Sequence, residues 1–392
     1  MKKLLAVMMM ATTLQVQAQQ VGTWATAAEY TGQGDMPRMS LAETSLRQII
    51  RVSIGGTKHR MQFSNEFSSE PVEIKAVYLA DAKDSCDINA KKVTYLSFDG
   101  KRSVTIPAGA TVWSDDFKRP IQPLQRLSVT IQYGKQVPEH ATSHRGSRTT
   151  SYIARGAVKP GKPFPTVEKV DHWYNMVKLN TLTECEAVAI LGNSITDGRG
   201  STTNLQNRWP DFMSTALNAN VDGSEGVGVL NLGIGGNCVV EGGLSEPALK
   251  RFDRDILGQS GVKTLIIFEG TNDLGISNGN TEQVVKKLIA AYQTLIDKAH
   301  QAGMKVYGGT ITPFKGNGWY SYFHEAGRRT VNDWIRTSGK FDGIVDFDQL
   351  VRDPNDPEKL RAEYSEDWLH LNPRGYEAMG KYAAEVIMKG DR

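Results

Sequence analysis

Short apolar stretches follow one another through the first 165 residues, separated by glycine, asparagine, aspartate and proline. In several of them apolar and polar side chains alternate, which predicts strands with one buried face. The clearest stretches are residues 49–54, 72–80, 103–106 and 127–131. We therefore expect residues 19–165 to form an all-β, jelly-roll-like sandwich domain.

The pattern changes from about residue 184, where fully apolar stretches alternate with longer amphipathic ones. Strands are predicted at residues 188–191, 227–232, 264–268, 305–311 and 344–347. Helices are predicted at residues 208–217, 282–302, 320–336 and 373–388, the last with Asn372 as its N-cap. Apolar strands that alternate with helices indicate an α/β domain at 184–392, with a parallel sheet covered on both faces.

The sequence between the two patterns is rich in proline and glycine. Residues 159–165 (KPGKPFP) are typical of a connection between domains, and residues 166–183 are expected to be a linker. A chain of 392 residues also has the length of two ordinary domains.

The N-terminus has the features of a signal peptide at residues 1–18. Lys2 and Lys3 precede an apolar run at residues 4–14, and small residues at Val16 and Ala18 suit cleavage after Ala18. The apolar run is too short for a membrane span, which needs about 20 residues. We expect an exported protein, periplasmic or secreted, with no stable membrane insertion.

Composition narrows the set of partners. The formal net charge is +3, and Lys2 and Lys3 lie in the segment expected to be removed, so nucleic acid is not a predicted partner. The three cysteines leave at least one thiol unpaired, and a Cys86–Cys185 bridge between the domains stays open. No cysteine or histidine cluster has metal-ligand spacing.

Four loops beside the predicted strands carry candidate chemistry. GNSITDG (192–198) presents Ser194 after a strand, although a lone serine there is more often a helix cap. The loops NLGIGGN (231–237) and EGTND (269–273) offer glycine N–H groups and the Asn272 amide, and each alone fits an ordinary turn. DWLH (367–370) places Asp367 three residues before His370, although a lone motif of this kind is weak.

Together these loops contain the parts of a serine hydrolase. Ligands bind parallel sheets at the carboxyl ends of the strands, so the loops meet at one edge. Ser194 is the predicted nucleophile, His370 its base, and Asp367 the group that orients the base. No metal or organic cofactor is needed for this chemistry.

With these four blocks the sequence resembles the SGNH hydrolases, or GDSL-type esterases and lipases. The resemblance implies a flavodoxin-like three-layer fold and an oxyanion hole of Ser194, Gly236 and Asn272. FSNEF (63–67), SVTIPAGA (103–110), RFDRDIL (251–257) and ITPF (311–314) are similar to a two-domain bacterial subgroup. One residue departs from the common GDS block, because Asn193 stands where the aspartate is expected.

These features predict an esterase that removes acetyl groups from a polysaccharide. The alternatives are a general short-chain carboxylesterase or lipase and, in another class, a non-catalytic glycan-binding protein. Candidate substrate contacts are Trp209, Trp319 and Tyr320, and His144 in the polar stretch 141–148, although core packing and a solvated loop are competing interpretations.

Overall fold

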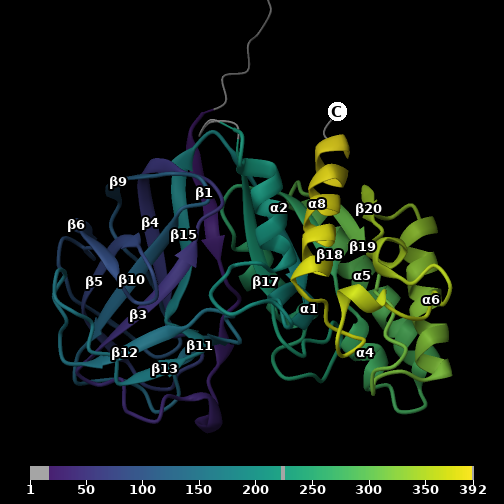
Figure 1. Ribbon diagram of the computed structural model, residues 1–392, viewed down its shortest axis with the longest axis horizontal. Coiled ribbons are helices and arrows are strands. Elements are labelled where there is room, and N and C mark those ends of the chain that lie inside the picture. Colours follow the sequence, from purple (N-terminus) through teal and green to yellow (C-terminus); the bar gives the residue numbers. More distant parts are fainter. Residues whose placement is uncertain (1–16, 222–225, 391–392) are drawn as a thin grey trace, which may run out of the picture.

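The computed structural model describes residues 17–221 and 226–390, so nearly all of the expected signal peptide lies outside it. Two parts stand side by side in Figure 1: an all-β part in purple to teal, and an α/β part in teal to yellow. No described helix is both long enough and apolar enough to cross a membrane.

The first part consists of antiparallel strands. They are β1 (Gln19–Ala25), β2 (Glu29–Tyr30), β3 (Thr44–Arg51), β4 (Gly56–Ser64), β5 (Val72–Ala82), β6 (Ile88–Tyr95), β7 (Val104–Ile106), β8 (Thr111–Trp113), β9 (Phe117–Ile121), β10 (Arg126–Tyr133), β11 (Thr142–Arg145), β12 (Ser151–Arg155), β13 (Glu168–Val170), β14 (His172–Tyr174) and β15 (Met176–Thr183). One sheet has the order β1-β15-β4-β8, with β9 on β4, and another has β13-β12-β3-β10-β5-β6, with β7 on β5. A small sheet, β14-β11-β2, completes this part.

The two larger sheets share one apolar core, as a sandwich requires. Leu46 of β3 and Ile131 of β10 come from one sheet, and Phe63 of β4 and Leu179 of β15 from the other. All four side chains are inaccessible to solvent. The all-β antiparallel prediction is therefore confirmed.

The linker prediction for residues 166–183 is wrong. This segment holds β13, β14 and β15, and β15 pairs with both β1 and β4 inside a sheet. The proline-rich stretch 159–165 lies between β12 and β13, so it does not connect two domains. The chain passes into the α/β part between Thr183 and Glu186.

The second part is built on a parallel sheet. Its strands are β16 (Glu186–Gly192), β17 (Val227–Gly233), β18 (Val262–Phe268), β19 (Lys305–Gly309) and β20 (Gly343–Val345). Its helices are α1 (Ser194–Asp197), α2 (Trp209–Asn218), α3 (Ala248–Phe252), α4 (Thr271–Gly275), α5 (Thr281–Gln301), α6 (Tyr322–Thr337), α7 (Phe347–Val351) and α8 (Pro373–Gly390). The sheet order β17-β16-β18-β19-β20 is flavodoxin-like, as predicted.

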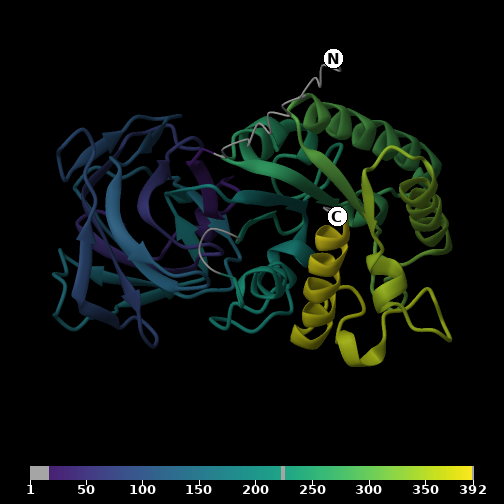
Figure 2. The same ribbon diagram turned by 90° about the horizontal axis from the view of Figure 1, so that it is seen from above.

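Helices cover both faces of this sheet, and Figure 2 shows α8 and α5 on opposite sides. The cause lies in β16, whose side chains point alternately to the two faces. Val188 and Ile190 pack with α2 and α8, whereas Ala189 and Leu191 pack with α5 and α6. After the exposed Glu186, the strand is apolar because both of its faces are buried.

The two parts meet along β17, the edge strand of the parallel sheet. Strand β1 packs against it, and Val21 of β1 joins the core of the α/β part. The backbones approach closely, because a Cβ at Gly228 would come 2.4 Å from the carbonyl oxygen of Gly22. The N–H of Val229 donates to Ser53 Oγ (3.0 Å), so this edge is covered by the β part.

The disulfide between Cys86 and Cys185, which the sequence left undecided, is not formed. Cys86 packs against the small cluster of Tyr152, Ala154, Val158 and Phe164. Cys185 belongs to the core of the α/β part, where the Thr183 hydroxyl donates to its sulfur (3.3 Å). The two thiols therefore lie in different clusters.

Gly233 at the end of β17 allows α1 to lie against the sheet. A Cβ there would come 2.5 Å from the backbone nitrogen of Asp197. We expect Gly233→Ala to lower the free energy of unfolding by about 3 kcal/mol in urea titrations, because backbone must shift. Gly34→Ala is the control, since a Cβ at Gly34 meets nothing within 4 Å. Equal stability of the two variants would contradict this close packing.

Candidate active site

The candidate site lies at the carboxyl edge of the parallel sheet. Gly192 of β16 is level with Gly233 of β17 and Phe268 of β18 in the strand register. The loops that follow these three strands therefore begin at the same level along the strand direction. This is also where the strand order reverses, between β16 and its neighbours, and ligands bind such sheets there.

Ser194, His370 and Asp367 form a continuous hydrogen-bond chain. Ser194 Oγ lies 2.9 Å from His370 Nε2, and His370 Nδ1 lies 2.6 Å from Asp367 Oδ2. With a carboxylate at Nδ1, that nitrogen carries the ring hydrogen, so Nε2 can accept the serine proton. The structure therefore brings the three predicted residues together in one hydrogen-bond chain.

The turn around Asp367 keeps its carboxylate charged and oriented. Its Oδ1 accepts backbone N–H groups from Leu369 (3.0 Å) and His370 (2.8 Å). Burial alone would raise the pKa of Asp367, but these hydrogen bonds and the His370 ring hold it below its usual value. Ser365 Oγ donates to the His370 carbonyl (2.8 Å) and fixes the backbone beneath the ring.

The capping residue of α1 is Asn193, so Ser194 is not used as a cap. Asn193 Oδ1 accepts the N–H of Ile195 (3.0 Å), and Ser194 begins the helix. The helix ends at Gly198 in a left-handed conformation (φ 101°). The asparagine that replaces the usual aspartate therefore performs the same capping function, because both residues are good N-caps.

Gly236 and Asn272 lie in the same cavity as Ser194 and His370. Gly236 has a positive φ of 71°, and the Leu244 N–H donates to its carbonyl (3.1 Å). The Asn272 amide donates to the carbonyl of Asn237 (2.8 Å), which ties the second and third loops together. These bonds hold the two loops in place, and both predicted oxyanion donors line the same cavity as Ser194.

The cavity has a volume of about 650 Å³ and two chemically different walls. Leu244, Ile276 and Trp319 supply an apolar wall. The charged wall includes five residues of the β part: Asp35, Arg145, Arg148, Asp171 and His172. No local pattern identifies these residues, although Arg145 and Arg148 belong to the polar stretch 141–148.

Of the four candidate substrate contacts, only Trp319 lines the cavity. Trp209 is fully buried against Phe268 and Phe347, so its predicted contact is wrong and core packing is correct. Tyr320 is outside the lining, and its hydroxyl donates to Glu358 (2.7 Å). That bond, more than burial, raises the pKa of Tyr320 to about 12.

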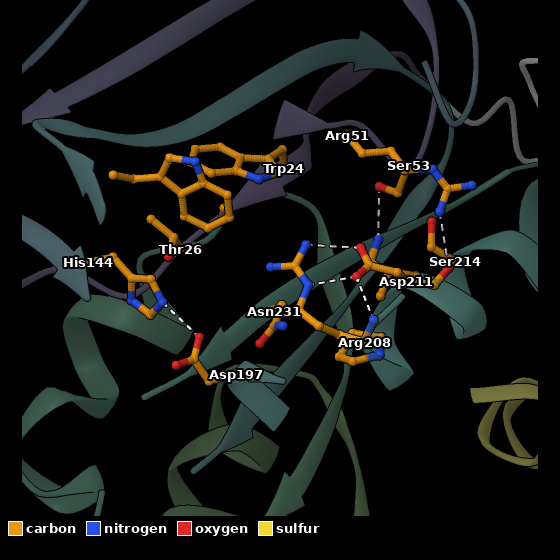
Figure 3. Close-up of a pocket in the computed structure, with 14 residues that line it drawn as sticks. Trp24, Thr26, Arg51, Ser53, His144, Asp197, Arg208, Asp211, Ser214 and Asn231 are labelled. Atoms are coloured by element: carbon orange, nitrogen blue, oxygen red, sulfur yellow. Dashed lines mark hydrogen bonds and ion pairs between the residues drawn. The ribbon is translucent and has the colours of Figure 1, made fainter. Parts of the chain in front are cut away.

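His144 is also wrongly assigned as a substrate contact, because it is 2% exposed and is not among the residues that line the cavity. Figure 3 shows its ring directed at Asp197 across the boundary between the two parts. Nε2 lies 2.8 Å from Asp197 Oδ1, and Nδ1 lies 2.9 Å from the Ala27 carbonyl. Both partners only accept hydrogen bonds, so both ring nitrogens must donate and His144 is an imidazolium.

Two neighbouring carboxylates, Asp197 and Glu29, stabilise the charged form of His144. Burial alone would lower its pKa, but Asp197, followed by Glu29, raises it above the usual value. The ring also stacks on Trp173 (5.8 Å between centroids). Because Asp197 ends the helix that Ser194 begins, the β part holds the far end of the nucleophile helix.

No group of three or more potential metal ligands occurs within residues 17–221 and 226–390.

Residues 190–378 match the family model of the GDSL-like lipase/acylhydrolase family. No curated protein matches the chain. Among solved structures, similarity is found to a GDSL-like lipase from Bacteroides thetaiotaomicron (22% identity, 52% of this chain and 88% of the other, TM-score 0.39). A carbohydrate acetylesterase family member from Sinorhizobium meliloti is also similar (16% identity, 52% of this chain and 98% of the other, TM-score 0.41). A third similar structure is a catalytic mutant of an acetylxylan esterase from Geobacillus stearothermophilus (17% identity, 52% of this chain and 94% of the other, TM-score 0.40).

The buried imidazolium predicts a pH-dependent contribution to stability. Because the pKa of His144 is raised in the folded state, the stabilisation is complete below its usual value of 6.5 and is lost as pH rises through the raised value. We expect His144→Gln to lower the free energy of unfolding by about 3 kcal/mol at pH 6 and by less at pH 9.

Urea titrations at both pH values measure this difference against the unsubstituted protein. The control is His140→Gln, since His140 bonds to the Thr31 carbonyl (3.2 Å) and not to a carboxylate. A loss in His144→Gln that is the same at both pH values would contradict the charged state.

Proposed function

Because residues 190–378 form a GDSL-like lipase/acylhydrolase domain, we propose that the protein is a serine esterase that removes acetyl groups from a polysaccharide. The observation that carries this proposal is the hydrogen-bond chain from Ser194 through His370 to Asp367. Ser194 is the nucleophile, His370 the general base, and Asp367 the residue that orients it. We further propose that residues 1–18 are a signal peptide and that the protein is exported.

The mechanism follows from the positions of these groups. His370 Nε2 takes the proton of Ser194 as Oγ attacks the ester carbonyl carbon. The N–H groups of Ser194 and Gly236 and the Asn272 amide stabilise the negative oxygen of the tetrahedral intermediate, and each such donor contributes about 10²–10³ in rate. His370 then protonates the leaving alcohol, and the acyl group stays on Ser194. Water, deprotonated by His370, releases the acid and restores the serine.

The space beside the oxyanion donors supports a short acyl group. The Leu244 side chain stands over Gly236, where a Cβ would come within 2.7 Å of it. Trp319 stands over Gly275 at the end of α4, so closely that a Cβ there would overlap its ring. Leu244 and Trp319 line the same cavity as Asn272, and we infer from their bulk that an acetyl group suits this space better than a long chain.

Two alternative functions can be distinguished from the proposed one by experiment. A general short-chain carboxylesterase or lipase would use the same residues on a different alcohol. A non-catalytic glycan-binding protein would not need Ser194 within hydrogen-bond distance of His370, and that short contact favours the enzyme. No nucleic acid partner or cofactor forms part of the proposal.

Replacement of the nucleophile gives the first test. We expect Ser194→Ala to lose hydrolysis of p-nitrophenyl acetate by at least about 10³-fold while its circular dichroism and melting temperature are kept. The same substitution should abolish labelling by a fluorophosphonate probe. Ser103→Ala, an exposed residue, is the control for serine loss elsewhere. Failure of the unsubstituted protein to be labelled would favour the glycan-binding alternative.

Acyl-chain selectivity gives the second test. The unsubstituted protein should hydrolyse p-nitrophenyl acetate with a higher kcat/KM than the octanoate. Trp319→Ala should raise the octanoate-to-acetate ratio by about tenfold, because it removes the ring that limits the acyl space. Tyr320→Ala is a suitable control, since this neighbour lies outside the cavity lining. A preference for octanoate in the unsubstituted protein would instead support the lipase alternative.

A further inference from the structure

The charged wall of the cavity contains two arginines that no described carboxylate neutralises. We propose that Arg148 and Arg199 bind a carboxylate on the alcohol side of the ester, so that the substrate is an acetylated glycan of uronic acids. This inference rests on the proposed esterase function and specifies the sugar that carries the acetyl group. It assigns the β part a direct place in substrate recognition, because Arg148 belongs to it.

Arg148 is held in an unusual and well-supported conformation. Its φ is +55°, which non-glycine residues adopt rarely and chiefly where surrounding contacts enforce it. Its carbonyl accepts the N–H of Asn204 (2.9 Å), and Asn204 Oδ1 accepts the N–H of Thr150 (2.7 Å). The side chain lines the cavity, and its buried Nε has no hydrogen-bond partner.

Arg199 comes from the nucleophile loop. Its N–H donates to the carbonyl of Ser194 (2.9 Å), and its own carbonyl accepts the Tyr376 hydroxyl. The side chain is exposed and lines the same cavity. Its backbone is therefore fixed relative to the nucleophile, while its guanidinium is available to a ligand.

The other charged residues of this wall already have ion-pair or hydrogen-bond partners. Arg145 donates to Glu29 (2.8 Å), and Asp35 lies 3.7 Å from Arg145 and 3.9 Å from His172. Asp171 accepts Ser147 Oγ (2.9 Å) and the N–H of Thr149 (3.1 Å), and Asp197 is paired with His144. Among residues 17–221 and 226–390, Arg148 and Arg199 make no ion pair. The formal charges of the lining balance, but these two cations are not paired.

The position of Arg199 indicates that it faces the alcohol part of the ester substrate. His370 protonates the leaving oxygen, so the alcohol lies on the His370 side of the cavity. Arg199 is on that side, since a Cβ at the adjacent Gly200 would lie 3.6 Å from the His370 Cβ. The apolar wall of Leu244 and Trp319 lies by the oxyanion donors instead. Guanidinium groups bind carboxylates with two parallel hydrogen bonds, which suits a uronate better than a neutral sugar.

The experiment compares deacetylation of acetylated polygalacturonan with that of acetylated xylan, by acetate release at low salt. We expect the unsubstituted protein to prefer the acidic glycan. Arg148→Met and Arg199→Met should each lower the acidic-to-neutral ratio of kcat/KM by roughly tenfold, mainly through KM. Arg148→Lys and Arg199→Lys should lower it less, because they keep the charge without the planar fork. Salt at 0.5 M should also reduce the ratio in the unsubstituted protein.

The control is Arg155→Met, an exposed arginine outside the cavity lining, whose ratio should equal that of the unsubstituted protein. Equal or better activity on xylan, or Met variants with an unchanged ratio, would overturn the uronate subsite while p-nitrophenyl acetate hydrolysis still supports the esterase. Absence of hydrolysis on every ester would instead overturn the proposed function itself.

Discussion

The hydrogen bond between His144 and Asp197 is the interaction on which the arrangement of the site depends. The nucleophile helix has only four residues, too few to be stable alone, so both of its ends need partners. Asn193 caps its start, and a buried imidazolium from the other part of the chain holds Asp197 at its end. Ser194 is thus positioned by two segments about 50 residues apart in sequence. The β part therefore helps to position Ser194, in addition to lining the cavity.

Much of the fold could be predicted because its signals are local. Helix α2 was expected at residues 208–217 and spans Trp209–Asn218, and α8 begins at Pro373 with Asn372 accepting the N–H groups of Arg374 and Gly375. Periodicity and capping chemistry act within a few residues, so a sequence displays them directly. The pairing of Asp367 with His370 was accessible for the same reason, since the two are three residues apart.

The errors all concern contacts between distant segments. Strand β15 was expected to be a linker because its partners, β1 and β4, precede it by more than 100 residues. The proximity of Trp209 to the nucleophile in sequence suggested a substrate contact, yet its helix turns the ring into the core beneath the sheet. For His144, a polar stretch was recognised correctly, but only the fold shows that its arginines face the cavity while the histidine faces Asp197.

The asparagine at position 193 also has a physical explanation in the fold. It lies beside Glu269, a fully buried carboxyl at the end of β18. Burial raises the pKa of Glu269 well above its usual value, although Arg251, 3.7 Å away, opposes that shift. An aspartate at 193 would add a second carboxylate next to this group, at a position with little access to water. Capping of α1 requires only an acceptor oxygen, which an amide supplies without charge. Asn193 therefore caps α1 without placing another carboxylate beside the buried Glu269.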